Sequence, residues 1–494
     1  MSSGYDISTV RSGFVPDREQ RSSIRATVVS QEARLDLVDV QLRELKTKMD
    51  LLHSQHKAIT EAISIEQGLL APIRRLSPEI MQIIFKYTLG EITSFAPDDV
   101  PILLTHVCAN WRRIALKTPR LWNEIYAHAY SPGVNNKHAL FQMWLQNAGK
   151  TPLNMDLDME KLKGSALATM LLNLGTLHRC RRLSIQGSKE KIMDGLPVRV
   201  TLTLLESLCI MASRLSRNED EWTTTDHHWE FPNLRSLRLY ESGVLLSKIV
   251  ITPNNLRELT IKTETTKTPV PYSVWIDLWM NCSNLESVNV DLDSIAPGHD
   301  IGAPERFDCE GLKVLKLGLG WSCEPRDILF LERLWAPNLV YLRLSTNGWI
   351  LGNPMYSAIY SVVSQSSKLK RLSLVGIDLE TVKARELLNA ATELETIKVS
   401  SNSFINALFP PQDSPPDTWA CPALSNLKIK GDRFSQADVL ALVGSRARTG
   451  MGGVDSRHYL TTVKAEGPIY KVLRRVQTTE LNIVEGRSTY WGFA

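Results

Sequence analysis

Few residues of this sequence have the types and spacing that support catalysis or metal binding. Two adjacent histidines, His227 and His228, follow Asp226, but no further ligand stands at a spacing typical of a metal site. Gly318 begins the stretch GLGWSC, which lacks the third glycine and the Lys-Ser/Thr end of a phosphate-binding loop. The sequence also has no nucleophile elbow and no zinc-protease motif. We therefore predict that the chain is not an enzyme and holds no metal or cofactor, and we interpret the histidines as part of an exposed polar loop.

Basic residues instead recur at fixed places within a repeated string of apolar residues. Each string ends in two apolar residues separated by one variable residue, as in Leu342-Arg343-Leu344. Three variable positions adjoin these two apolar residues, and across ten strings only Glu258 and Asp291 are acidic there. Nine of these positions are basic: Arg182, Arg238, Lys262, Lys316, Arg343, Arg371, Lys398, Lys428 and Lys430.

A strip of cations of this kind suits an acidic or phosphorylated segment of a target protein. A concave basic surface focuses electrostatic potential, and arginine makes bidentate contacts with anions. The alternative is that these are solvated charges on an exposed sheet. Nucleic acid fits less well, because only Tyr240 and Tyr341 accompany the strip and single-strand binding relies on stacked aromatic rings. We assign target binding to Arg238, Lys262, Lys316, Arg343, Arg371, Lys398 and Lys428.

The repeated strings predict the elements that would carry this strip. Their period of two places both apolar side chains on one face of a short strand and the residue between them on the other face. The strings recur every 22–30 residues between Cys180 and Ile429, close to the ~20–29 residues of a leucine-rich repeat. Intervening stretches, such as 271–284 and 356–368, have the pattern of amphipathic helices.

Stacked strand-and-helix units bury their apolar faces against one another and form a solenoid with a parallel sheet. In such a sheet Lys316 would align with Arg343, and Lys398 would lie near Lys428. We therefore predict an α/β chain in which an irregular leucine-rich-repeat solenoid occupies residues 151–494. Residues 438–445 are expected to be helical, and degenerate strings at Leu460-Val463-Ala465 and Leu481-Ile483 are expected to form a C-terminal cap.

Residues 24–67 carry a different, heptad pattern. Apolar residues such as Leu45 and Leu52 repeat at one heptad position, and Leu35 and Leu42 repeat at the other. This 3.5-residue period predicts one long helix with an apolar seam. The seam needs a partner, which is either a second copy of the chain or the C-terminal part of the same chain. We interpret residues 1–23, which are polar and lack periodicity, as a disordered tail.

Between the seam and the repeats, residues 70–128 predict a small helical domain. Ser77 is a suitable N-cap, Pro78 fits the first helical position, and Glu79 favours the first turn. A second apolar stripe at spacings of three and four residues runs from Leu103 to Ile114 and predicts a second helix. Helices this short are marginal alone, so we expect this segment to dock on a partner.

This small helical segment resembles an F-box. The family pattern has a Leu-Pro start, Glu-Ile, Ile-Phe, Val-Cys, Trp, Arg and a closing Pro-x-Leu-Trp, in that order. The one departure is Ser77 where the family usually has proline. The matching residues are Leu76, Pro78, Glu79, Ile80, Ile84, Phe85, Val107, Cys108, Trp111, Arg112, Pro119, Leu121 and Trp122.

The order of heptad helix, F-box-like segment and irregular leucine-rich repeats resembles the expanded F-box family of mushroom-forming fungi. The resemblance implies a substrate-recruiting subunit of an SCF-type cullin–RING ubiquitin ligase. A Skp-type adaptor would grip the F-box and connect it to a cullin, and the solenoid would hold the target protein. The alternative is a repeat scaffold that binds a partner without any ligase. The predicted adaptor contacts are Leu76, Pro78, Ile80, Ile84, Phe85, Val107, Cys108 and Trp111.

Composition is compatible with this reading. The chain has 494 residues, 43% hydrophobic and 22% charged, which excludes a wholly disordered protein. A net charge of +4 gives no whole-chain case for binding nucleic acid or membranes. The first 20 residues have no apolar run, no stretch is long enough to cross a membrane, and seven cysteines show no pattern. We expect an intracellular chain, cytoplasmic or nuclear.

Overall fold

The structure is a computed structural model of the whole chain, which divides into two units, Met1–Ile83 and Ile84–Ala494. Each unit is described by itself. The described residues are 7–90, 100–127, 137–160, 172–212, 227–252, 255–262, 270–292, 295, 306–320, 325–350, 353–410, 419–431, 434–446, 459–474 and 481–486.

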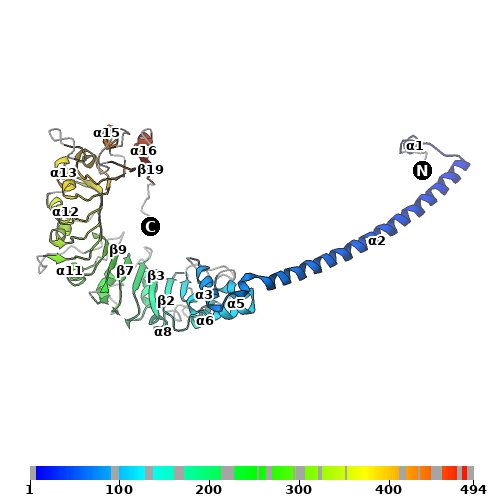
Figure 1. Cartoon of the computed structure of the whole chain (residues 1–494), viewed down its shortest axis with the longest axis horizontal. Coiled ribbons are helices and arrows are strands. Elements are labelled where there is room, and N and C mark those ends of the chain that lie inside the picture. Colours follow the sequence, from blue (N-terminus) through cyan, green and yellow to red (C-terminus); the bar gives the residue numbers. More distant parts are fainter. Residues whose placement is uncertain are drawn as a thin grey trace. The chain divides into compact units, whose positions relative to one another are not determined.

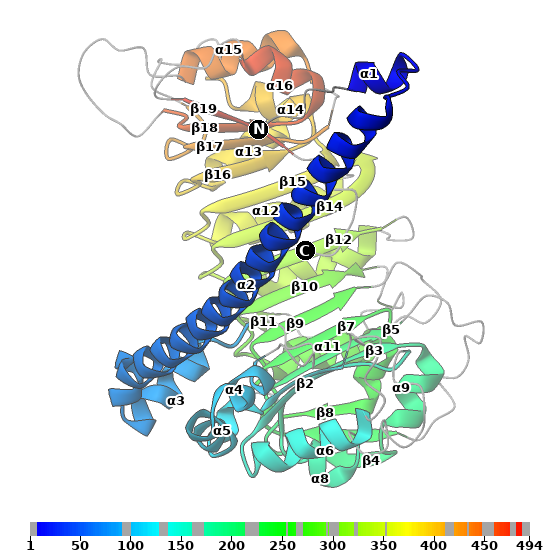
Figure 2. The ribbon, with the colours of Figure 1, turned by 90° about the vertical axis from the view of Figure 1, so that its right-hand side faces the viewer.

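The first unit is dominated by the long helix predicted from the heptads, α2 (Arg18–Leu70) (Figures 1 and 2). Asp17 caps it: the Asp17 carboxylate accepts from the Gln20 backbone N–H at 2.8 Å, and the Gln20 side chain accepts from the Asp17 N–H at 3.0 Å. The helix begins before and ends after the predicted range 24–67, and α1 (Ile7–Arg11) precedes it. The predicted disordered tail, 1–23, is therefore partly helical. This correction follows from the polar N-cap, which heptad counting does not detect.

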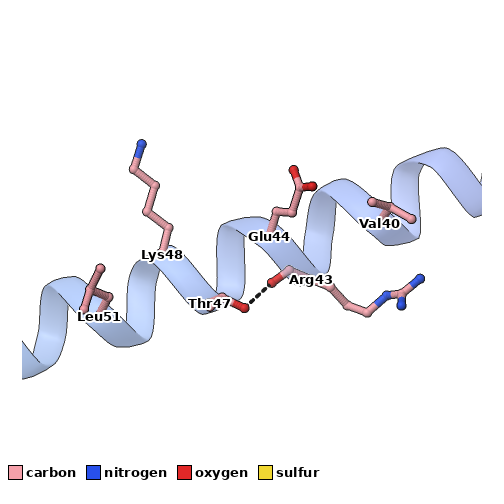
Figure 3. A pocket seen from close by; sticks show the side chains of 6 residues that line it. All are labelled: Val40, Arg43, Glu44, Thr47, Lys48 and Leu51. Atoms are coloured by element: carbon pink, nitrogen blue, oxygen red, sulfur yellow. Dashed lines mark hydrogen bonds between the residues drawn. The ribbon is translucent and has the colours of Figure 1, made fainter.

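The side chains of α2 are all at least partly exposed, so its apolar seam is not buried. A shallow depression on this helix is bordered by residues of α2 alone, and Figure 3 shows them along one stretch of the helix. There the Thr47 hydroxyl donates to the Arg43 carbonyl at 2.9 Å. With a single helix as its wall, the depression does not enclose a ligand. Its bordering residues are Val40, Arg43, Glu44, Thr47, Lys48 and Leu51.

The segment that resembles an F-box is helical, as predicted. It contains η1 (Pro72–Arg75), α3 (Pro78–Tyr87), α4 (Ile102–Val107), α5 (Ala109–Leu116) and η2 (Pro119–Leu121). α3 begins where expected, with the Ser77 hydroxyl 3.5 Å from the Ile80 N–H. The second stripe does not form one helix, because the backbone is extended at Cys108 (φ −161°, ψ 168°) and separates α4 from α5. Periodicity alone passes over such a one-residue break.

The second unit is built on a parallel sheet that has fourteen strands among the described residues. All ten predicted strings form strands of this sheet, and the two degenerate strings form β18 and β19. Two further strands, β1 and β2, start the sheet before the first predicted string, and β1 precedes the predicted solenoid boundary at residue 151. In spatial order the strands are β1 (Glu124–Ala127), β2 (Leu153–Asp158), β3 (Cys180–Gly187), β5 (Ser207–Ala212), β7 (Ser236–Tyr240), β9 (Glu258–Lys262), β10 (Ser287–Asp291), β12 (Val314–Leu319), β14 (Tyr341–Ile350), β15 (Arg371–Asp378), β16 (Thr396–Val399), β17 (Asn426–Ile429), β18 (Thr462–Ala465) and β19 (Asn482–Glu485).

Helices and short strands cover one face of this sheet, and Figure 1 shows α11, α12 and α13 along the outer side of the strands. The helices predicted at 271–284, 356–368 and 438–445 are present as α11, α12 and α15. Small parallel sheets formed by β4, β6 and β8 and by β11 and β13 replace helices elsewhere. The remaining elements are α6 (Lys137–Ala148), α8 (Leu174–Leu177), α9 (Lys189–Gly195), η3 (Gly243–Lys248), α11 (Tyr272–Asn281), η6 (Pro325–Arg333), α12 (Asn353–Gln365), α13 (Thr381–Ala390), α14 (Asn402–Ala407), α15 (Gln436–Arg446), α16 (Gly467–Leu473), β4 (Arg199–Thr201), β6 (His228–Phe231), β8 (Ile249–Ile251), β11 (Phe307–Asp308) and β13 (Leu334–Trp335).

The core of this unit is a stack of leucine-type side chains between the sheet and its covering elements. Leu315, Leu342, Leu372 and Ile397 are paired in register on neighbouring strands and are essentially inaccessible to solvent. Each strand therefore buries its alternating apolar residues only because the next strand covers them. The residues between them lie on the opposite face, which is left open by this packing.

Candidate functional site

Two surfaces correspond to the residues selected from the sequence, and the first is carried by α4, α5 and the end of α3 from Ile84 onward. Phe85 is fully buried and packs against Trp111, with ring centroids 5.0 Å apart. The indole N–H of Trp122 donates to the Ala115 carbonyl at 2.9 Å and fixes the end of α5. The Arg112 guanidinium donates to the Thr105 carbonyl at 2.8 Å and joins α5 to α4. These F-box-like residues thus form the interior and the joints of the segment.

The eight predicted adaptor contacts divide by exposure. Phe85 is interior and can act only as support. Ile84, Cys108 and Trp111 are half-buried, whereas the others are exposed to solvent. An exposed apolar side chain on a small helical segment is available for contact with another protein. The exposed members are Leu76, Pro78, Ile80 and Val107.

Sequence reasoning missed several exposed apolar residues of the same helices. On α3, Ile83 and Tyr87 follow Ile80 at helical spacing and are exposed. On α4, Leu103 precedes Val107 by one turn, and both are exposed. Of the second apolar stripe, only Leu104 and Ile114 are fully buried. The sequence did carry a signal for these exposed residues, because the stripe has more apolar residues than a short helix can bury.

The second surface is the open face of the sheet, where the residues between the two buried apolar positions of each strand form one row. The register pairs Lys316 with Arg343 and Lys398 with Lys428, as predicted. It also adds Lys464 on β18, which pairs with Lys428. Lys464 was overlooked because its string is degenerate. From β12 to β18 this row, called the basic row below, reads Lys316, Arg343, Ser373, Lys398, Lys428 and Lys464.

The other predicted cations do not all belong to this cluster. Arg238 lies in the same register further toward the N-terminus, but its guanidinium is 3.4 Å from the Glu258 carboxylate. Thr260 and Asn289 occupy the positions between Arg238 and Lys316. Lys262 and Arg371 lie in the rows on either side. The positive charge is therefore concentrated in the C-terminal half of the sheet instead of spreading along its whole length.

Neighbouring cations act on two lysines of the basic row, Lys316 and Lys398. Partial burial, together with the charges of Arg343 and Lys262, lowers the pKa of Lys316. Partial burial and the charges of Lys430 and Arg343 likewise lower the pKa of Lys398, against an opposing effect of Glu466. Within the described part of the chain none of the five cations of the row forms an ion pair. This surface consequently carries a positive field that no ion pair within the described residues neutralises.

The histidines do not form the exposed loop that the sequence suggested. His227 is buried with its ring edge-to-face against Trp229 at 5.5 Å, and His228 lies in β6 beside Glu230. Asp226 lies outside the described residues. Among the residues that the structure describes, no group of three or more possible metal ligands is present. In that same part of the chain, no helix is both long and apolar enough to span a membrane.

Comparison with known proteins does not identify a family, so the functional assignment depends on these two surfaces. No protein-family model matches the chain, and no curated protein matches it. A solved structure, the complex of Rad7 and Elc1 in yeast, is similar over 76% of this chain and 92% of that chain, with 16% sequence identity and a TM-score of 0.31. So low a similarity score assigns no function. The repeats and the register of the sheet identify the second unit as an irregular leucine-rich-repeat solenoid with a parallel sheet.

Proposed function

We propose that this chain is a substrate-recruiting subunit of an SCF-type ubiquitin ligase. In this proposal the helical segment 70–128 binds a Skp-type adaptor, and through it a cullin, while the solenoid binds a target protein. The observations that carry the proposal are the exposed apolar residues Leu103 and Val107 of α4 and the Phe85–Trp111 contact that joins the end of α3 to α5. The two α4 side chains are exposed in the chain alone, which fits residues that become buried when a partner binds.

The proposal assigns different roles to exposed and interior residues. Ile80, Val107 and the neighbouring Leu103 would enter the adaptor interface directly. Phe85 and Trp111 would keep α3 and α5 together, so that their replacement would act through the fold of the segment. Cys108 is half-buried at the junction of α4 and α5, and we assign it a packing role.

Val107→Asp tests the adaptor role with little risk to the fold, because the Val107 side chain is 53% exposed. An unpaired carboxylate buried in an interface costs several kcal/mol, so binding of a purified Skp-type adaptor to the full chain should weaken about 100-fold or more. Isothermal titration calorimetry measures this change. Val382→Asp, at a 69% exposed position on α13, is the matched control and should bind like the unmodified chain.

The unmodified chain itself provides the decisive outcome. Failure of the full chain to form a complex with excess adaptor would refute the ligase role. The chain would then be a repeat scaffold that binds its partner without a ligase. Equal affinity of the Val107→Asp and Val382→Asp variants would instead show that α4 is not the contact.

A further inference from the structure

The basic row contains one residue that is not basic and whose side chain makes no hydrogen bond. Ser373 on β15 is paired with Arg343 on one side and with Lys398 on the other. Its side chain is 3% exposed, and its hydroxyl oxygen makes no hydrogen bond within the structure. A buried hydroxyl without a partner is costly, so its presence between two cations calls for a physical reason.

The side chains on either side of Ser373 cannot accept its proton. Arginine and lysine carry only donors, so Arg343 and Lys398 offer no acceptor for the Ser373 proton. Together the three side chains provide three donor groups on this face of the sheet. Neighbouring parallel strands are about 4.8 Å apart, which places the Cα atoms of Arg343 and Lys398 about 10 Å apart with Ser373 between them. One ligand that offers several acceptor oxygens can meet all three groups.

We propose that the open face around Ser373 binds a phosphoryl group on a peptide segment of a target protein. Arg343 and Lys398 supply the flanking positive charges, and the Ser373 hydroxyl donates a hydrogen bond to a phosphate oxygen. Lys316, Lys428 and Lys464 extend the field along the row to acidic residues that flank the phosphorylated position. The proposal deepens the proposed function by naming the target class, but peptide binding itself does not require the adaptor.

A phosphoryl group fits this place better than a carboxylate. It carries up to two negative charges and three strong acceptor oxygens, which match the three donors. It would also relieve the mutual repulsion that the positions of Lys398 and Arg343 impose. The carboxylates near the row are few: Glu466 follows β18, and Asp291 ends β10 against Gly318. Glu466 forms no ion pair with a cation of the row within the described residues.

The same row suits a single-stranded nucleic acid less well. Such ligands depend on aromatic side chains on which the bases stack. The basic row contains no aromatic residue, and Tyr341, in the row beside it, lies under the Lys316 ammonium at 5.6 Å. A buried hydroxyl donor between two cations also matches a localised anion more closely than a continuous backbone.

The first experiment screens the full chain against arrays of synthetic peptides. Each array has degenerate flanking residues around a fixed central position, which is phosphoserine, serine or aspartate. We expect capture of phosphoserine peptides, with acidic flanking residues favoured, and at least tenfold weaker capture of the serine and aspartate arrays. Equal capture on the three arrays would overturn the proposal. An oligothymidine that displaces the best phosphopeptide at lower concentration than inorganic phosphate and unlabelled peptide would also overturn it.

The second experiment measures the best phosphopeptide by fluorescence polarisation with substituted chains. Arg343→Gln/Lys398→Gln should weaken binding at least tenfold, because charge-assisted hydrogen bonds are lost. Lys313→Gln/Lys370→Gln removes the same charge from positions directly before β12 and β15. These lysines are already paired with Glu286 and Glu395, so this control should bind normally. Ser373→Ala should weaken binding several-fold.

Adaptor binding by the same chains separates this proposal from the ligase role. The Arg343→Gln/Lys398→Gln chain should keep full affinity for the adaptor, and Val107→Asp should keep full affinity for the phosphopeptide. Phosphopeptide binding that is unchanged in Arg343→Gln/Lys398→Gln would refute the site even if the adaptor binds as proposed.

Discussion

Replacement of Ser373 tests whether its hydroxyl is unsatisfied in the folded chain. An unpartnered buried hydroxyl costs about 1–3 kcal/mol, and Ser373→Ala removes only that oxygen from a position that is 3% exposed. We therefore expect Ser373→Ala to increase the free energy of unfolding by about 1 kcal/mol. The gain is smaller than the full cost because the removed oxygen also made van der Waals contacts. The serine that the proposed site uses for binding would then lower the free energy of unfolding of the chain.

Ser366→Ala is the matched control, because Ser366 is also buried but its hydroxyl is bonded. It lies 2.6 Å from the Val362 carbonyl and 3.2 Å from the Ala336 carbonyl. Its removal should decrease the free energy of unfolding by about 1–2 kcal/mol. The two Ser→Ala changes are thus expected to have opposite signs and to differ by about 2 kcal/mol or more.

Urea unfolding of the full chain, followed by circular dichroism, measures both changes if the slopes with denaturant stay equal. A decrease for Ser373→Ala as large as that for Ser366→Ala would mean that the Ser373 hydroxyl has a partner in the folded chain. The Ser373 hydroxyl would then need no acceptor from a ligand bound between Arg343 and Lys398.

Two further predictions concern the long helix and the buried thiols. If the heptad seam of α2 pairs two copies of the chain, Leu45→Asp should convert a dimer to a monomer in sedimentation. Leu37→Asp is the control, because Leu37 is equally exposed but lies outside the seam, and it should leave the dimer intact. An unchanged mass for Leu45→Asp would favour packing within one chain. Burial raises the pKa of Cys180, Cys309 and Cys421 to about 12, so the folded chain keeps protons that the unfolded chain loses above its ordinary value of 9.0. Stability should therefore be complete below about pH 9 and fall toward pH 12 by up to about 1.4 kcal/mol per pH unit for each thiol. Cys421→Ala should make this fall shallower in urea unfolding at a series of pH values, and an unchanged slope would contradict the assigned pKa.

The sequence determined those features that depend on neighbours along the chain. The Leu-x-x-Leu-x-Leu strings predicted ten strands because a period of two is a local property of an extended backbone. The Ser77-Pro78 start of α3 was equally local, since an N-cap needs only the first turn of its helix. The alignment of Lys316 with Arg343 followed from the repeat, because stacked units place equivalent residues on neighbouring strands.

The tertiary structure alone decided which of these residues are available for binding. Arg238 has the same place in its string as Arg343, but only the register with β9 shows that Glu258 neutralises it. Phe85 and Val107 both match the F-box pattern, yet packing buries the first and exposes the second. The unsatisfied hydroxyl of Ser373 depends on its neighbours Arg343 and Lys398, which are 30 and 25 residues away in the sequence, so no local pattern could reveal it. Burial and hydrogen-bond satisfaction are set by residues distant in sequence, and these properties distinguish a binding residue from a solvated one.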